Sequence, residues 1–460
     1  MNFLKLLYHA QFHGANRLAD RTSRWYFIPP MLMLLLSSIM LVIFTVNRYL
    51  SNPTYIVHME KLIRTRSFPS VVLCPEIAFL ESKMDEFLSE LKYPTGMNAS
   101  DFRDILPQLA AFYAPDMLYE LDDLMRLEEL LIYNDINVEQ AGLRLTSTCE
   151  ETIIRCRFGR KFLNCSEIFT MEMTGAGFCC VFNGRSLRRE MQENGEGKKS
   201  KPVTNSTRWK TSHFGYSSGL MLAVNQSQLK PLNIDLYYKW IALQTSQHFV
   251  DTANNGSVLN PGCEQWIAYY TNSFNIGVEV KELSTSLRKC YLSVDGLLEY
   301  FPIYNKRYCL LECEMANTMK ACKCLRTAHL QPPGATQCRA AKLRCATHAM
   351  VPYDTELCNC LSTCEVEMVY TNVASFDLNS MVKPLDSFYD DLDFDKVTIV
   401  RVFIENRKQN VRQRTSYFSY MDLFSQLGGV FNVFFGCSIL TLLGFIQIGW
   451  RTMLVPFKKQ

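Results

Sequence analysis

Two long stretches of apolar, uncharged residues stand near the two ends of the chain. Residues 25–47 form the first stretch, and residues 423–450 form the second. Each can cross a bilayer as a helix, which requires about 20 such residues. The first apolar run is longer than that of a cleaved signal peptide, which makes the signal peptide the weaker alternative. We therefore predict transmembrane helices at residues 25–47 and 421–450.

The second stretch differs from an ordinary membrane anchor because small and polar residues recur along one side of it. At about 100° per residue of an α-helix, these residues fall within one narrow sector. A membrane helix turns such a stripe toward other helices or toward water. Taken alone, the stripe fits tight helix packing as well as the lining of a pore. Its residues are Ser425, Gly428, Gly429, Asn432 and Gly436.

The segments outside the two stretches are short and basic. Residues 1–24 and 451–460 both contain more Lys and Arg than Asp and Glu. Because positive charge beside a membrane helix marks its cytoplasmic side, we expect both termini in the cytoplasm. Residues 48–420 then form one large domain on the opposite side, with enough chain to bury a hydrophobic core of its own.

Cysteine content predicts an oxidising compartment for this large domain. All of the 18 cysteines except Cys437 lie between Cys74 and Cys364. Disulfides persist outside the cytosol, whereas cytosolic thiols are kept reduced. The same region holds five sequons for N-linked glycosylation, and five sequons in that place agree with the cysteines. They begin at Asn98, Asn164, Asn205, Asn225 and Asn255.

The large domain mixes helical and strand patterns. Apolar residues at helical spacing predict helices at residues 81–91 and 115–133, and a further helix carries two cysteines at 306–320. Short runs rich in β-branched and aromatic residues predict strands. The fold class is therefore an α+β membrane protein with two transmembrane helices and a large disulfide-rich domain. The predicted strands are residues 67–74, 219–224, 264–270, 276–280 and 397–404.

The most specific local pattern is a group of ten cysteines within residues 290–364. Its two Cys-x-Cys pairs cannot close on themselves without strain, so each cysteine must reach a more distant partner. A zinc site would more often use Cys-x-x-Cys pairs, and an oxidising compartment disfavours free thiolates. The pattern therefore predicts disulfides, but it leaves their connectivity open. The ten are Cys290, Cys309, Cys313, Cys322, Cys324, Cys338, Cys345, Cys358, Cys360 and Cys364.

Several further motifs accompany this cysteine pattern. A His-Gly pair precedes the first apolar stretch, Phe-Pro-x-Val-x-x-Cys follows it, and an adjacent Cys-Cys pair lies further along the chain. With these motifs the chain resembles the degenerin and epithelial sodium channel (DEG/ENaC) family over nearly its whole length. The Cys-Cys pair is similar to that of the arthropod pickpocket group. The matching residues are His13, Gly14, Phe68, Pro69, Val71, Cys74, Cys156, Cys165, Cys179 and Cys180.

The resemblance implies a subunit of a trimeric, sodium-permeable cation channel in the plasma membrane. Its large domain would form palm, finger, thumb and knuckle parts around a β core and would gate the channel. Residues 290–364 would be the thumb. The expected partners are sodium ions, membrane lipid and further subunits, identical or related. The implied disulfides are Cys74–Cys179, Cys156–Cys165, Cys290–Cys364, Cys309–Cys360, Cys313–Cys358, Cys322–Cys345 and Cys324–Cys338, with Cys149, Cys180 and Cys263 unassigned.

The resemblance also implies a selectivity filter in the second apolar stretch. Gly436, Cys437 and Ser438 match the family's Gly-x-Ser motif. In a ring of three copies, such small residues expose carbonyl and hydroxyl oxygens that replace the ion's water. On an ideal helix Ser438 points away from the stripe that contains Gly436, so this role requires the helix to break near Gly436. Packing by three small residues is the alternative.

Ser425 stands at the family's gate position, where a small side chain permits closure and a bulky one should hold the pore open. Two positions depart from the family. Asn432 replaces the usual Gly or Ser near the amiloride site, and Gly444 replaces the usual Glu of the inner pore. The other expected lining residues are Gly428, Gly429 and Asn432, and the motif expected to influence opening is His13 and Gly14.

The sequence disfavours other classes of protein. It contains no His-Glu-x-x-His, Gly-x-Ser-x-Gly or phosphate-loop motif, so we expect neither an enzyme nor a cofactor or metal site. A net charge of +3, without a basic block, disfavours nucleic-acid binding. An ATP-gated trimeric channel would lack the cysteine pattern, and a two-pass scavenger-type receptor would lack the polar stripe. A non-conducting or obligate heteromeric regulatory subunit stays open as an alternative.

Overall fold

The structure, a computed structural model, divides the chain into two compact units. The helical unit comprises residues 1–57, 276–288 and 413–460, and the sheet unit comprises residues 58–275 and 289–412. Parts of both units are described. The described residues are 22, 24–51, 54–74, 79–113, 118–175, 177–186, 209–226, 239–245, 256–295, 298–332, 334–349, 358–378, 381, 384–436, 438, 443 and 446.

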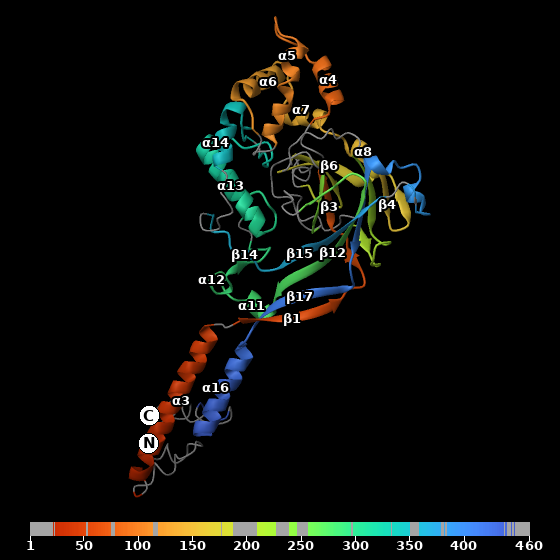
Figure 1. The fold of residues 1–460 in the computed structure, drawn as a ribbon. Helices are drawn as coiled ribbons and strands as arrows, with labels where there is room; N and C mark the ends of the chain where they lie inside the picture. The colour runs from red at the N-terminus through yellow and green to blue at the C-terminus, as the bar shows by residue number, and fades with distance from the viewer. Residues whose placement is uncertain are drawn as a thin grey trace, which may run out of the picture. The chain divides into compact units, whose positions relative to one another are not determined.

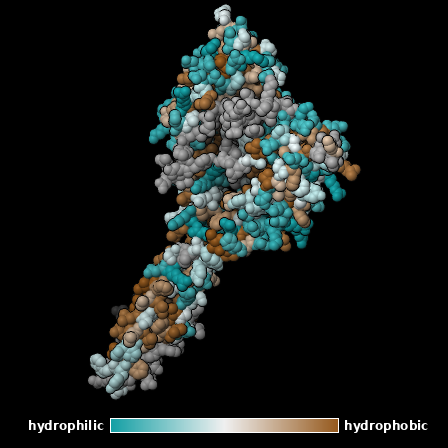
Figure 2. Space-filling model, viewed as in Figure 1, coloured by the Kyte–Doolittle hydropathy of each residue, from teal (hydrophilic) through white to brown (hydrophobic). Residues whose placement is uncertain are grey.

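Two long helices that pack against each other dominate the helical unit (Figure 1). They are α3 (Arg24–Leu50) and α16 (Tyr420–Phe435), and the unit also contains α11 (Val278–Lys281) and α12 (Thr285–Arg288). Figure 2 shows hydrophobic side chains gathered along α3 and α16. On α3 one exposed apolar row repeats every four residues and consists of Leu32, Leu36, Met40 and Phe44. Such a row is suited to contact with lipid rather than with water.

Among the described residues, α3 is the one helix long and apolar enough to cross a membrane. Its candidate span is Trp25–Leu50, three residues longer at its C-terminal end than the predicted 25–47. The second predicted span, 421–450, is only partly described, because α16 ends at Phe435 and few residues beyond Gly436 lie within the described ranges. The second span therefore stays a prediction.

An eight-stranded sheet forms the centre of the sheet unit, in the order β1-β17-β12-β16-β9-β4-β5, with β15 also paired to β12. Strand β16 consists almost wholly of β-branched and aromatic residues, and every one of them is buried, as expected for a central strand. It pairs in parallel with β12 and antiparallel with β9. The bounds are β1 (Thr54–Leu62), β4 (Ile153–Phe158), β5 (Lys161–Leu163), β9 (Leu220–Asn225), β12 (Cys263–Ile276), β15 (Val366–Asp377), β16 (Val397–Ile404) and β17 (Lys408–Ser416).

A second, five-stranded sheet has the order β11-β10-β3-β7-β6. The ring of Phe68 lies edge-on to Phe158, Phe182 and Tyr269, so aromatic side chains fill the core shared with the larger sheet. The bounds are β3 (Ser70–Cys74), β6 (Phe169–Thr174), β7 (Gly177–Phe182), β10 (Trp240–Gln244) and β11 (Ser257–Val258), and two small sheets pair β2 (Arg66–Ser67) with β8 (Lys210–Thr211) and β13 (Cys290–Tyr291) with β14 (Ser362–Thr363).

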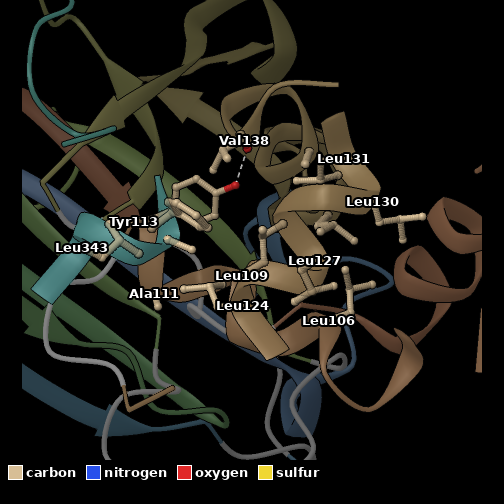
Figure 3. Packing of buried hydrophobic residues seen from close by; sticks show 14 of the residues in the cluster. Leu106, Leu109, Ala111, Tyr113, Leu124, Leu127, Leu130, Leu131, Val138 and Leu343 are labelled. Carbon is tan, nitrogen blue, oxygen red and sulfur yellow. Dashed lines mark hydrogen bonds between the residues drawn. The ribbon is translucent and has the colours of Figure 1, made fainter. Parts of the chain in front are cut away.

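A cluster of short helices packs around a leucine-rich core (Figure 3). The hydroxyl of Tyr113 donates a hydrogen bond to the carbonyl of Val138, which satisfies a polar group within this apolar core. Gly142 lies so close that an added Cβ would stand 2.3 Å from the Tyr113 hydroxyl. Only glycine therefore fits at position 142. The elements are α4 (Glu81–Glu90), α5 (Ala99–Arg103), η1 (Leu106–Phe112), α6 (Leu121–Tyr133) and α7 (Val138–Leu145).

Disulfides hold α13 (Lys306–Cys322) and α14 (Leu343–His348) in the sheet unit. The structure contains the same seven pairs that the family resemblance implies, and it adds Cys149–Cys180. Among the described cysteines, Cys263 is free. The eight pairs are Cys74–Cys179, Cys149–Cys180, Cys156–Cys165, Cys290–Cys364, Cys309–Cys360, Cys313–Cys358, Cys322–Cys345 and Cys324–Cys338.

One predicted strand is wrong. Residues 276–280 do not extend β12, which ends at Ile276. Gly277 caps the next helix, α11, which begins at Val278. The alternation of apolar residues there continues the pattern of β12, but glycine at a helix N-cap ends the strand.

Candidate pore helix

The start of α16 is fixed by its own residues. Ser419 is the N-cap, and its hydroxyl accepts a hydrogen bond from the backbone nitrogen of Asp422 at 3.2 Å. The carboxylate of Asp422 in turn accepts from the Ser419 backbone nitrogen at 3.0 Å and from the Ser419 hydroxyl at 2.7 Å. This capping box satisfies backbone donors that the first turn of a helix leaves unpaired.

The small and polar stripe of α16 points away from α3. Along α16 the partly buried positions include Leu423, Leu427, Val430 and Phe434, which share the face that packs against α3. At about 100° per residue, this face lies roughly opposite the stripe. The stripe positions Ser425, Gly428, Gly429 and Asn432 are exposed. These four positions are therefore not used to pack the two helices of one chain, whereas Gly436, at the end of the stripe, is partly buried.

Both glycines of the stripe have open space beside them. A Cβ added at Gly428 or at Gly429 would meet no atom within 4 Å. In close helix packing of the small-residue type, a neighbouring backbone lies against the glycine, because the missing side chain makes room for it. Within one chain, packing therefore does not explain the glycines. On α3 the least exposed positions carry small polar side chains, Ser38 at 3% exposure and Thr45 at 6%.

The helix ends at the position where a selectivity filter would require a break. Gly436 is the C-cap of α16 and has a left-handed backbone, with φ of 62°. Its backbone nitrogen donates to the carbonyl oxygen of Asn432 at 2.8 Å. Glycine adopts this conformation without the steric penalty of a Cβ. Ser438 is exposed, whereas Cys437 and Gly444 lie outside the described residues.

Aromatic residues and one arginine connect the ends of the two helices. The guanidinium of Arg48, in the last turn of α3, lies 5.0 Å from the ring centre of Tyr417 and 5.7 Å from that of Phe418. The ring of Phe418 also lies 6.5 Å from that of Tyr49, and Tyr417 lies 5.9 Å from Tyr55. Cation–π and edge-to-face contacts of this kind are attractive. This group was not predicted from the sequence, although a charged residue beside aromatic residues at a helix end is a signal for it.

Arg414 joins three segments of the helical unit. Its Nε donates to the hydroxyl of Thr54 at 2.8 Å, and its Nη1 donates to the carbonyl of Arg288 at 2.7 Å. Its own carbonyl accepts from the backbone nitrogen of Gly277 at 2.8 Å. One side chain and its peptide thus connect β1, α12 and the start of α11 to β17.

The remaining predicted site residues are only partly within the described ranges. His13, Gly14, Asn205 and Asn255 lie outside them. Of the other sequons, Asn98 and Asn164 are exposed on the sheet unit. Asn225 is half-buried at the end of β9, and its side-chain nitrogen donates to the carbonyl of Glu151 at 3.2 Å. A glycan on Asn225 would replace one of the two hydrogens of the nitrogen that makes this bond.

Comparison with known proteins decides the family. The amiloride-sensitive sodium channel family matches residues 6–448, which is nearly the whole chain. The chain belongs to this family. It is 24% identical to sodium channel protein Nach of Drosophila melanogaster over 401 residues, which cover 82% of this chain and 72% of that protein. It is 21% identical to pickpocket protein 19 of the same species, over 84% of this chain and 77% of that protein.

More distant proteins also match. Acid-sensing ion channel 4-B of Danio rerio is 22% identical over 86% of this chain and 65% of that protein. A solved structure of a proton-activated chloride channel aligns with 92% of this chain and 97% of its own, at 9% identity and a TM-score of 0.31. The curated relatives support the arthropod pickpocket-like group. Family membership places the chain among ion-channel proteins of the plasma membrane.

Proposed function

We propose that this chain is a subunit of a trimeric, sodium-permeable cation channel that is gated through its extracellular domain. It would cross the plasma membrane twice, at α3 and at residues 421–450, with both termini in the cytoplasm. Three subunits, identical or related, would bring their copies of α16 around one axis. Family membership supports a channel, and the features of α16 support the assignment of the pore to this helix.

The observation that carries the proposal is the direction of the small and polar stripe. On α16 the apolar face packs on α3, and the exposed stripe contains Ser425, two glycines with open space beside them, and Asn432. A polar stripe in a membrane is costly unless it faces water or polar partners. A shared axis between three copies provides both water and polar partners for the stripe. The stripe would then line the pore, and Ser425 would form the gate at the narrowest point of the pore.

The break at Gly436 supports a filter directly after the gate segment. A continuous helix uses its carbonyl groups in its own hydrogen bonds, so it cannot offer them to an ion. The left-handed Gly436 ends that pattern and allows the following residues to extend. Carbonyl groups near Gly436 and the hydroxyl of Ser438 could then replace part of the water around a sodium ion. Backbone of this kind is tolerated at membrane depth where it lines a water-filled path.

The test replaces Ser425 with valine and measures whole-cell current at rest in cells that express the chain. The larger side chain should prevent the pore from closing at this position. We therefore expect resting inward sodium current to rise severalfold. Replacing external sodium with N-methyl-D-glucamine should abolish this current. The matched control is Val430→Ile, which adds bulk to the opposite face of α16 and should leave resting current unchanged. Surface biotinylation should show equal delivery of all three chains.

Two results would contradict this assignment. An equal rise in both variants would mean that general disturbance of α16, rather than bulk in the pore, opens the channel. Absence of current from wild type and Ser425→Val, despite normal surface delivery, would contradict a homomeric channel. Current that then appears on co-expression with a related subunit would identify an obligate heteromeric subunit.

A further inference from the structure

Asp422 is the one charged residue of α16, and residues 423–450, the rest of the second predicted span, contain no other. An ionisable side chain within a membrane segment is costly, and in membrane proteins it commonly marks an ion path. Asp422 lies in the first turn of the helix, next to the exposed rings of Tyr417 and Tyr420, which are of the kind that anchor at a membrane surface. We therefore expect water to reach this carboxylate and to keep it ionised.

Only one of the two carboxylate oxygens of Asp422 serves the capping box. Oδ2 accepts both hydrogen bonds from Ser419, at 3.0 Å from its backbone nitrogen and at 2.7 Å from its hydroxyl. Within the described part of the chain, Oδ1 accepts no hydrogen bond and the carboxylate forms no ion pair. The residue is exposed. One oxygen thus holds the carboxylate in place, and the other is open to water or to a cation.

Two arginines of the helical unit that could neutralise this charge bind other groups. The guanidinium of Arg48 lies over the rings of Tyr417 and Phe418. That of Arg414 donates to the hydroxyl of Thr54 and to a backbone carbonyl. The negative charge of Asp422 is therefore left for a mobile ion.

Asp422 lies on the side of α16 that carries the small and polar stripe. Residues seven apart on an α-helix differ by only about 20° in direction, so Asp422 lies on nearly the same side as Gly429. The space beside Gly429 is open, and Ser425 is exposed one turn further along the helix than Asp422. In the trimer proposed above, this side of α16 faces the shared axis. Three copies of Asp422 would then form a ring of negative charge before the gate.

Such a ring would also offset positive charge that the helices themselves carry. The N-terminus of an α-helix is equivalent to roughly +0.5 of an elementary charge, so three such ends at one entrance would repel cations. Each ionised Asp422 adds a full negative charge beside one of these ends, which makes the sum negative. Charge of one sign around an opening raises the local concentration of oppositely charged ions, and rings of Asp or Glu do this in cation channels.

We propose that Asp422 concentrates monovalent cations at the outer entrance of the pore, through the carboxylate oxygen that the capping box leaves free. This inference rests on the proposed channel function and adds to it a residue that favours cations over anions. The competing role of Asp422 is structural, because a carboxylate here also stabilises the first helical turn. The two roles differ in their response to salt. Attraction of mobile ions is screened as ionic strength rises, whereas the hydrogen bonds of the cap are not.

The experiment measures single-channel conductance of the purified full chain in planar bilayers of phosphatidylcholine, which has no net charge. All variants carry Ser425→Val, which supplies resting current. Asp422→Asn removes the charge and leaves an amide oxygen for the cap. At about 0.1 M sodium chloride, where the Debye length is about 10 Å, we expect conductance for ions that enter from the α16 N-terminal side to fall about twofold. At about 1 M, where this length is about 3 Å, the two conductances should converge.

Three further variants separate charge from capping. Ser419→Ala breaks the capping box and keeps the charge, so it should lower the melting temperature and leave conductance unchanged. Asp422→Glu keeps the charge on a longer side chain and should retain the conductance that Asp422→Asn loses. Glu129→Gln removes an exposed carboxylate from α6 of the sheet unit and should conduct as the background does.

Each outcome decides between the two roles. The proposal is overturned if Asp422→Asn conducts as the background does at about 0.1 M, if its deficit persists at about 1 M, or if Ser419→Ala lowers conductance equally. Any of these results leaves the channel itself intact, because current is still measured. If the chain conducts only with a related subunit, the same comparison is made in that heteromer. Absence of current in both arrangements would overturn the channel proposal and this role with it.

Discussion

Glu314 on α13 is a mostly buried carboxylate whose charge depends on its neighbours. Its side chain is 19% exposed, its Oε1 lies 2.9 Å from Nε2 of His329, and Nη1 of Arg326 is 3.9 Å away. Burial alone would raise the pKa of Glu314. The hydrogen bond to His329 and the positive charges of His329, Arg326 and Arg307 outweigh burial and lower the pKa below its ordinary value of 4.5.

This pKa shift predicts a pH-dependent contribution to stability. A carboxyl group whose pKa is lowered by folding stabilises the folded state above its unfolded pKa, and that stabilisation is lost as pH falls through the folded pKa. We therefore expect Glu314→Gln to lower the melting temperature at pH 7 and to approach wild type well below pH 4.5. Thermal denaturation of the purified chain across this pH range measures the difference. The exposed Glu150→Gln should show no such convergence.

At the scale of single residues, the sequence predicted chemistry that depends on local pattern and missed chemistry that depends on folding. The filter that the family resemblance implies requires, by the helical wheel, a break near Gly436, and α16 does end there. Arg66 and Tyr269, in contrast, are about 200 residues apart in the sequence and interact electrostatically only because β2 and β12 border one cavity. No spacing rule connects two such positions.

Among the larger elements, the cysteine ladder of α13 provides a direct test of covalent stabilisation. The double variant Cys309→Ser with Cys360→Ser removes one disulfide, and an isolated bond of this kind contributes about 2 to 4 kcal/mol. Because Cys290–Cys364 and Cys313–Cys358 still restrain the same segments, we expect a loss near the lower limit, about 2 kcal/mol. The melting temperature of the purified chain measures this loss.

The free cysteine offers the matched control for the ladder. Cys263→Ser changes a thiol that is in no disulfide, so the melting temperature should change little, within about 0.5 kcal/mol of stability. A loss in the double variant no larger than that of Cys263→Ser would mean that the neighbouring disulfides alone hold α13.

Elements were predictable where burial or spacing left a strong pattern. The strand at 397–404 coincides with β16 because all eight positions are buried and nearly all are β-branched or aromatic. The helix at 115–133 was placed too early, since α6 begins only at Leu121, where acidic residues occupy its first turn. Pairing of Cys149 with Cys180 could not be predicted, because it depends on the packing of β7 beside α8 (Cys149–Thr152).

On the scale of the whole molecule, the chain passes between its two units four times, after residues 57, 275, 288 and 412. Residues 276–288, which lie within the predicted domain at 48–420, belong to the helical unit. Neither hydrophobic pattern nor cysteine spacing marks that return. The hydrogen bonds of Arg414 supply the reason, since they hold segments next to three of these four passages.

Arg414 should therefore determine how firmly these segments are held. Arg414→Gln removes the bonds to Thr54 and to the carbonyl of Arg288, and it leaves that carbonyl without its charged donor. We expect faster amide hydrogen exchange in peptides that cover residues 54–57 and 276–288, including Gly277, whose nitrogen donates to the Arg414 carbonyl. Exchange in the disulfide-rich α13 region should stay unchanged, because its covalent bonds do not involve these segments.

Arg412→Gln is the control, since it removes the same charge from an exposed position of the same strand, β17. Its exchange pattern should match that of wild type throughout. Equal exchange in both variants at residues 276–288 would show that backbone pairing alone holds this segment. Faster exchange in Arg414→Gln alone, with α13 unaffected, would assign the restraint to one side chain. The gating proposed above would depend on this restraint, because the chain enters the helical unit next to these segments.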